Sequence, residues 1–204
     1  MRLNVLKPAL LGAAVGLAAL PAFAQTKVTN QGITATEIVI GTHQDLSGPI
    51  KVWGVPVLNG MLLAVDEVNA KGGINGRKLR AIYEDDGYVP ARSVSAVKKL
   101  IDSDKVFALT GTTGSSHMVA MLPTIEEAKI PTIVHMAPNP AVVNPRRPTV
   151  FMIGPDYDWA GYVPIHHMIE KMGQKNGKFG ILYQDDDFGK ALLDLDHQGV
   201  NLPV

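Results

Sequence analysis

The segment Gly111 to Ser116, Gly-Thr-Thr-Gly-Ser-Ser, has the residue types of an anion-binding loop. Its glycines let backbone N–H groups approach a ligand closely, and Ser115 and Ser116 add hydroxyl donors. An apolar stretch with helical spacing follows, so the loop would stand at a helix N-terminus, where the partial positive charge favours a carboxylate. Serine is also a preferred helix N-cap, so plain capping is the alternative interpretation.

Two more polar segments follow predicted strands. They are Asp45 to Pro49 and Asp85 to Gly87. Ligands of open α/β sheets bind outside the carboxyl ends of the strands, so we expect all three segments at one edge of the sheet. Trp53 comes just after the first segment. It is interpreted either as an apolar wall over a ligand or as an ordinary surface aromatic.

The elements that must position these segments alternate between strands and helices. Short β-branched or apolar runs predict four strands, at residues 38–40, 79–83, 106–109 and 132–134, the third ending at Thr110-Gly111. Apolar residues three and four apart predict three helices. Their marker residues are Val57, Met61, Ala64, Val65 and Val68; Val94, Val97 and Ile101; and Met118, Met121, Leu122 and Ile125. This alternation predicts an α/β fold with a parallel sheet between flanking helices.

The composition changes after this lobe. Residues 137–148 contain four prolines, which indicates a long irregular connection. A strand is expected at 150–153, a helix at 159–172, a strand at 179–183 and a helix opening near Gly189. Two strands and one and a half helices cannot bury a core. We therefore expect a ligand-binding lobe over residues 25–148 and the start of an incomplete second lobe over 149–204.

Residues 1–24 have the pattern of a cleaved secretory signal peptide. Arg2 and Lys7 precede an apolar run over residues 10–20, and Ala22 and Ala24 are small residues at a cleavage site. The run is shorter than the roughly 20 residues that span a bilayer. The pattern predicts an exported protein, located in the periplasm.

Several classes of function are excluded or disfavoured. The chain has 19 basic and 19 acidic residues, so a nucleic-acid partner is not expected, and it has no Cys. The neighbouring His166 and His167 cannot share a metal on a helix, and the acidic run at 185–187 lacks the rest of a calcium loop. No Gly-x-Ser-x-Gly elbow surrounds Ser115, and His117 at i+2 does not face it. We expect no enzyme activity, no metal and no cofactor.

The order of motifs resembles that of the leucine/isoleucine/valine-type periplasmic binding proteins of ABC transporters, which have the type I periplasmic-binding-protein fold. The most specific marker is Asn-Ala-Lys-Gly-Gly-Ile-Asn-Gly at residues 69–76. Leu46 to Pro49, Trp53-Gly54, Tyr83 to Asp86, Gly111 to Ser116 and Tyr183 to Gly189 also match in order. The resemblance covers residues 36–193, roughly half of a usual member.

The resemblance implies a set of ligand-binding residues. Ser115, with Ser116 beside it, matches the serine that receives a ligand carboxylate. Met136, Ala137 and Pro138 match a segment that holds the ammonium and carboxylate, although Pro138 replaces a common Ser or Thr. Trp53 and Phe188 match aromatics beside the ligand, while Asp156 and Tyr157 face the cleft in many members. The usual acidic partner of the ammonium lies later in the family.

The implied function is that of a monomeric, periplasmic solute-binding component of an ABC importer. It would capture an amino acid of the branched-chain type, or a related small carboxylate, between two lobes and deliver it to a membrane permease. The alternatives are a ligand-sensing module that acts with a receptor partner and a non-functional truncated gene product.

Overall fold

The computed structural model of the protein describes residues 31–175 and 177–193. The predicted signal peptide, residues 1–24, lies outside these ranges. Within them, no helix combines the length and the apolar character that crossing a bilayer requires.

Five parallel strands form one sheet. They are β1 (Glu37–Gln44), β2 (Lys78–Asp85), β3 (Ala108–Thr113), β4 (Thr132–Met136) and β5 (Val150–Met152), and their order across the sheet is β2-β1-β3-β4-β5. Both neighbours of β1 were predicted as strands. Strand β2 pairs with one edge of β1, and the chain then returns to place β3 on the other edge. The predicted α/β class with a parallel sheet is confirmed.

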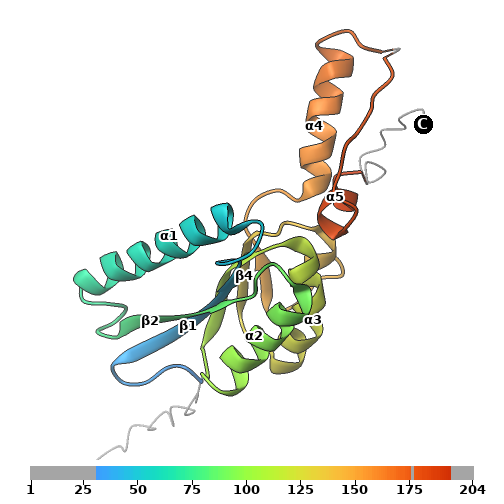
Figure 1. Ribbon diagram of the computed structural model, residues 1–204. Helices are drawn as coiled ribbons and strands as arrows, with labels where there is room; N and C mark the ends of the chain where they lie inside the picture. The colour runs from blue at the N-terminus through green and yellow to red at the C-terminus, as the bar shows by residue number, and fades with distance from the viewer. Residues whose placement is uncertain (1–30, 176, 194–204) are drawn as a thin grey trace, which may run out of the picture.

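Helices cover both faces of the sheet. Helix α1 (Lys51–Ala70) lies on one face, whereas α2 (Pro90–Asp102) and α3 (Ser115–Ala128) lie together on the other (Figure 1). The main core lies under α2 and α3. All four apolar residues predicted to form the inner face of α3 are buried there: Met118, Met121, Leu122 and Ile125.

Helix α1 is formed as predicted, but its buried face differs from the predicted one. Of the five marker residues only Val65 is buried, and Ala64 is exposed. The observed inner face consists of Gly54, Leu58 and Val65. The reason is a close approach at the start of the helix, where a Cβ on Gly54 would lie 2.1 Å from the Asp45 carbonyl oxygen. This contact, rather than the apolar spacing, sets the rotation of the helix.

The third strand extends beyond its predicted end at Gly111. Gly111 has φ +78°, and the register between β3 and β4 shifts between Thr110 and Thr112. Glycine adopts this left-handed conformation without a steric penalty, so the strand bulges here and continues to Thr113. The bulge carries the strand to the edge at which α3 begins.

The later elements follow a short 3-10 turn, η1 (Pro140–Val142). Strand β5 pairs with β4, so the first sheet continues past residue 148, and the boundary between lobes stays a prediction. Helix α4 (Tyr157–Glu170) then extends away from the sheet, and α5 (Asp187–Ala191) lies beside α3 (Figure 1). The strand predicted at 179–183 is not formed. No strand in the described ranges pairs with this segment, and Leu182 is fully exposed.

Candidate functional site

A cavity of about 370 Å³ lies where the carboxyl ends of β3 and β4 meet the beginnings of α1, α3 and α4. This is the edge of the sheet at which open α/β folds bind ligands. Ten residues line it: Ile50, Trp53, Tyr88, Thr113, Gly114, Ser115, Met136, Tyr157, Gln184 and Phe188. The lining is mostly apolar and aromatic, with a few polar groups, as is usual for sites that bind small molecules.

Ser115 supplies the unsatisfied polar group of the cavity. Ser115 is 2% exposed, and no hydrogen bond of ordinary geometry satisfies its Oγ. The Tyr157 hydroxyl lies near enough to interact with this oxygen. Ser115 is the first residue of α3, and no side chain caps this helix. The first backbone N–H groups of a helix have no partners within it. Hydroxyl and helix amides together can therefore receive a carboxylate.

Aromatic rings form the walls. The rings of Tyr157 and Phe188 meet edge to face, with 5.1 Å between their centroids, and join the start of α4 to α5. Trp53, which is 61% exposed, stands at the mouth. Burial raises the pKa values of Tyr88 and Tyr157, so both hydroxyls stay protonated at neutral pH and add no charge. The walls suit a ligand with an apolar or aromatic body.

The loops that carry Ile50 and Tyr88 are tied down by two aspartates. Buried Asp45 accepts hydrogen bonds from the backbone N–H groups of Gly48, at 2.5 Å, and Ile50, at 2.7 Å. Asp85 accepts from Leu46 and Gly87, at 2.9 and 3.0 Å. The Ser47 hydroxyl is the main cause that lowers the pKa of Asp85. These polar segments, which the sequence placed at the ligand edge, hold its loops in position.

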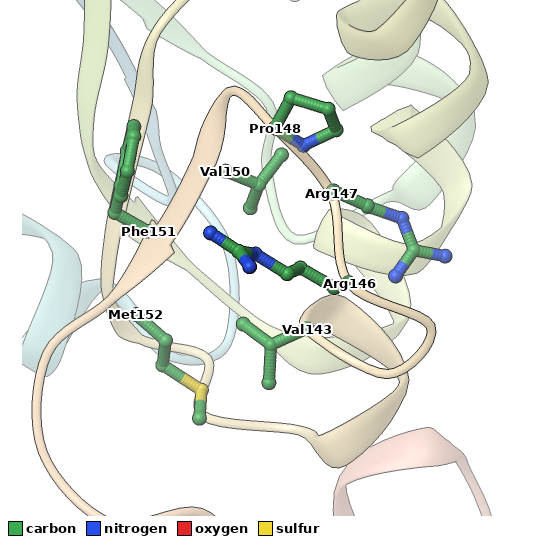
Figure 2. Close-up of a pocket in the computed structure, with 7 residues that line it drawn as sticks. All are labelled: Val143, Arg146, Arg147, Pro148, Val150, Phe151 and Met152. Carbon is green, nitrogen blue, oxygen red and sulfur yellow. The ribbon is translucent and has the colours of Figure 1, made fainter.

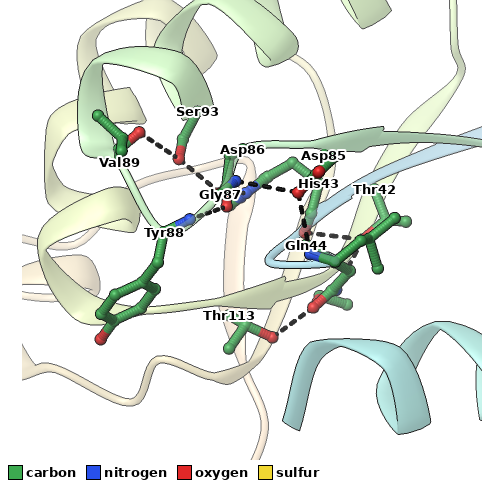
Figure 3. Close-up of polar contacts among 12 residues, drawn as sticks. Thr42, His43, Gln44, Asp85, Asp86, Gly87, Tyr88, Val89, Ser93 and Thr113 are labelled. Carbon is green, nitrogen blue, oxygen red and sulfur yellow. Dashed lines mark hydrogen bonds and ion pairs between the residues drawn. The ribbon is translucent and has the colours of Figure 1, made fainter. Parts of the chain in front are cut away.

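A second polar network joins the ends of β1 and β3 and includes Thr113, which lines the cavity (Figure 3). The Thr113 hydroxyl donates to Gln44 Oε1 at 2.6 Å, and Gln44 Nε2 donates to the Gly111 carbonyl and to Thr42 Oγ1. All these side chains are buried. The network fixes the bulged end of β3, and so fixes the backbone from which Gly114 and Ser115 continue.

Five of the nine predicted ligand-binding residues line this cavity: Trp53, Ser115, Met136, Tyr157 and Phe188. Ser116 instead points to α5, where its Oγ lies 3.3 Å from Asp186 Oδ2. Ala137 is fully buried, and Pro138 and Asp156 line an adjacent hollow of about 390 Å³ beside α4. Whether any of the nine contacts a ligand stays a prediction.

Sequence reasoning missed several lining residues, chiefly Ile50, Tyr88 and Gln184. Tyr88 directly follows Asp85-Asp86-Gly87, and Gln184 begins the turn before α5. For Tyr88, the available signal was an aromatic residue directly after a segment that was already expected at the ligand edge. Gln184 lies within the segment 183–189 that matches the family resemblance. Thr113 and Gly114 belong to the glycine-rich segment, which was recognised as a whole.

A third hollow, of about 280 Å³, runs along the outer edge of the sheet (Figure 2). The Arg146 side chain lies across it, whereas the Arg147 guanidinium points out of it. Arg147 pairs with Glu126 at 2.6 Å and donates to carbonyl groups of the η1 turn, so it stabilises the fold locally. Among residues 31–175 and 177–193, no group of three or more His, Asp or Glu side chains could hold a metal ion.

Comparison with known proteins agrees with this architecture. A curated amino acid binding protein of Pseudomonas aeruginosa is 29% identical over 166 residues, which are 81% of this chain and 44% of that protein. The substrate binding protein LivJ of Streptococcus pneumoniae, a branched-chain amino acid transporter protein solved with isoleucine, matches with a TM-score of 0.71 and 26% identity. The match covers 81% of this chain and 47% of that one.

A fatty acid ABC transporter substrate-binding protein from Thermomonospora curvata has a TM-score of 0.72 and 27% identity, over 82% of this chain and 42% of that one. The chain thus spans less than half the length of the relatives it matches. The relatives are named for binding and transport, in agreement with the prediction of a non-enzyme. The family model described as periplasmic binding protein matches residues 37–195, and the chain belongs to this family.

Proposed function

We propose that this chain provides the first lobe, and the start of the second, of a periplasmic solute-binding component of an ABC importer. The bound solute is a small carboxylate, with branched-chain amino acids as the first class to test. The α3 end of the cavity holds the carboxylate, the aromatic walls hold the body of the ligand, and the second lobe closes over it. The closed form then delivers the ligand to a membrane permease.

The observation that carries this proposal is the buried Ser115 hydroxyl, which makes no hydrogen bond of ordinary geometry, at the uncapped N-terminus of α3. Leaving a buried hydroxyl without a partner costs free energy, which a ligand oxygen would recover. The positive end of the α3 dipole favours an anion at the same point. Charge and hydrogen-bonding capacity thus select the same kind of ligand group.

The cavity wall supports a ligand with an apolar body. Ile50 and Met136 complement the aromatic side chains, and the one amide in the lining is Gln184. The similar structures carry names of different ligand classes, isoleucine in one and fatty acid in another. The test therefore includes branched-chain amino acids, aromatic carboxylates such as benzoate, and short fatty acids.

Isothermal titration calorimetry of the purified chain with this panel tests the proposal. We expect heat of binding from at least one carboxylate and none from its neutral amide. Ser115→Ala removes a hydrogen bond to a charged group, worth about 1.5–3 kcal/mol, and should weaken binding about 10- to 100-fold. Ser95→Ala is the matched control, because Ser95 lies on exposed α2 surface and bonds only to the Ala91 carbonyl. Equal affinities for carboxylates and amides would contradict the proposed anion site.

A further inference from the structure

Tyr88 stands in the cavity wall with an unusual backbone conformation. Its φ is +58°, in the left-handed region that side-chain-bearing residues seldom adopt. Its hydroxyl lies near the Gln184 side chain, which also lines the cavity. A conformation of this kind persists when the surrounding contacts impose it. The contacts behind Tyr88 therefore decide where this part of the wall lies.

Asp86 holds the backbone of Tyr88. Its Oδ1 accepts the Tyr88 N–H at 2.9 Å, and its Oδ2 accepts from His43 Nδ1 and from the Ser93 hydroxyl, each at 2.7 Å (Figure 3). His43 and Asp86 are each 1% exposed. Asp86 contacts the Nδ1 side of the His43 ring, and the buried Nε2 on the other side has no hydrogen-bond partner.

His117 holds the ring of Tyr88. The two rings stack with 4.3 Å between centroids and 28° between planes. His117 is 2% exposed and lies two residues after Ser115 on α3. No hydrogen bond of ordinary geometry satisfies its ring nitrogens, although the Tyr88 backbone lies near enough to interact with the ring. A purely structural support for Tyr88 would be better served by an apolar ring, which carries no polar atoms to bury.

We propose that His117 is a positioning residue that sets the Tyr88 wall of the cavity, and that its protonation in mild acid releases this wall. The inference rests on the proposed function only in taking the cavity as the ligand site. It adds to that site a residue that lies behind the lining and couples its shape to pH.

The charges around His117 determine the direction of the effect. Burial is the main cause that lowers its pKa, and His43 on β1 acts in the same direction. Asp86, Asp186 before α5 and the Tyr88 backbone act in the opposite direction but do not overcome burial. Protonation therefore becomes favourable when the ring gains access to water, which requires Tyr88 to move from its stacked position. Acid should weaken the wall rather than strengthen it.

Fluorine NMR of the chain labelled with 3-fluorotyrosine tests this without a ligand. The Tyr88 resonance is assigned by its loss in Tyr88→Phe. We expect it to shift between pH 7.5 and 5, in a single step with a midpoint below 6.5. The step should be lost in His117→Phe, which keeps a stacked ring, and also in His117→Gln, which serves if the phenylalanine variant does not fold. His135→Gln is the matched control, because burial also lowers the pKa of His135 on β4.

The proposal is overturned if the wild-type Tyr88 resonance does not shift over this range, or if the step survives in either His117 variant. Loss of the step in His135→Gln would also overturn it, since the titrating group would then lie elsewhere. Because no ligand is present, these outcomes are separate from those of the carboxylate titrations. A chain that binds none of the carboxylates could still show the step, and a chain that binds one could lack it.

Discussion

At the scale of single residues, Asp86 gathers more buried polar contacts than its neighbours on the ligand edge. Asp86→Ala would leave the His43 Nδ1–H, the Ser93 hydroxyl and the Tyr88 N–H without their acceptor. Leaving a buried donor without its acceptor costs about 1–3 kcal/mol, and Asp86→Ala does this to three donors, so the loss is a large share of a domain's stability. We expect a loss of that size in urea unfolding followed by circular dichroism.

The control for Asp86 is Asp66→Ala on the exposed side of α1. A surface change of this kind should alter the free energy of unfolding by no more than about 0.5 kcal/mol. Similar unfolding midpoints for the two variants would show that the network around Asp86 is not a major source of stability.

Two histidines, His117 and His135, together with Asp86, predict two separate steps of acid destabilisation. Burial lowers the pKa values of His117 and His135 below the ordinary 6.5, so the unfolded chain binds protons first and stability falls as the pH drops through 6.5. For Asp86, burial acts to raise the pKa, but the His43 and Ser93 contacts lower it overall from 3.8. Its stabilising contribution should persist until the pH falls below 3.8.

Urea midpoints measured from pH 8 to pH 3 check this order of events. The double variant His117→Gln and His135→Gln should flatten the upper step and leave the lower one. An upper step that is unchanged in the double variant would assign it to other groups.

At the scale of elements, two glycines of α1 give opposite predictions for the same substitution. A Cβ at Gly54 would lie 2.1 Å from the Asp45 carbonyl oxygen, so Gly54→Ala must push α1 off its loop and should cost about 1–3 kcal/mol. A Cβ at Gly60 meets nothing within 4 Å, so Gly60→Ala should stabilise the helix by about 0.5–1 kcal/mol. Thermal melts of both variants are the measurement. Shifts of the same sign would contradict the docking of α1 through Gly54.

The sequence predicted these elements better than it predicted their contacts. The inner face of α3 followed from apolar spacing, because its residues pack under α2 in a continuous core. The inner face of α1 did not, because a backbone contact at Gly54 overrides the spacing. Strand β3 continues past its predicted end because Gly111 forms a bulge there. A glycine at this position is compatible with either the end of a strand or a bulge, so the sequence alone did not distinguish them.

The candidate site shows the same limit. Ser115 could be predicted because its chemistry is local, a serine at a helix start after glycines. Tyr88 and Gln184 come from loops that are far apart in the chain, and they meet only in the folded cavity. The support of Tyr88 by His117 likewise depends on tertiary stacking, which no sequence spacing between these two residues encodes.

At the scale of the whole molecule, the cavity depends on the docking of the turn before α5 against the start of α3 and the loop after β4. Ser116 Oγ lies 3.3 Å from Asp186 Oδ2 and accepts the Asp187 N–H at 3.3 Å, while Asn139 Nδ2 donates to the Asp187 carbonyl at 2.7 Å. Asp186 also accepts the Phe188 and Gly189 N–H groups and thereby caps α5. Residues 184 and 188 of the cavity wall are thus positioned by contacts outside the cavity.

The double variant Ser116→Ala and Asn139→Ala removes this docking without altering a residue of the cavity lining. Each hydrogen bond contributes about 0.5–1.5 kcal/mol, so the Phe188 and Gly189 amides should exchange with deuterium roughly 5- to 100-fold faster. Amides of the α3 core, such as those of Met121 and Ile125, should keep their exchange rates, because local opening at α5 leaves the core folded. Ser95→Ala on α2 serves as the control and should change neither set. Equal acceleration at α5 and in the core would instead mean that these contacts stabilise the whole fold, and that the wall does not open separately from it.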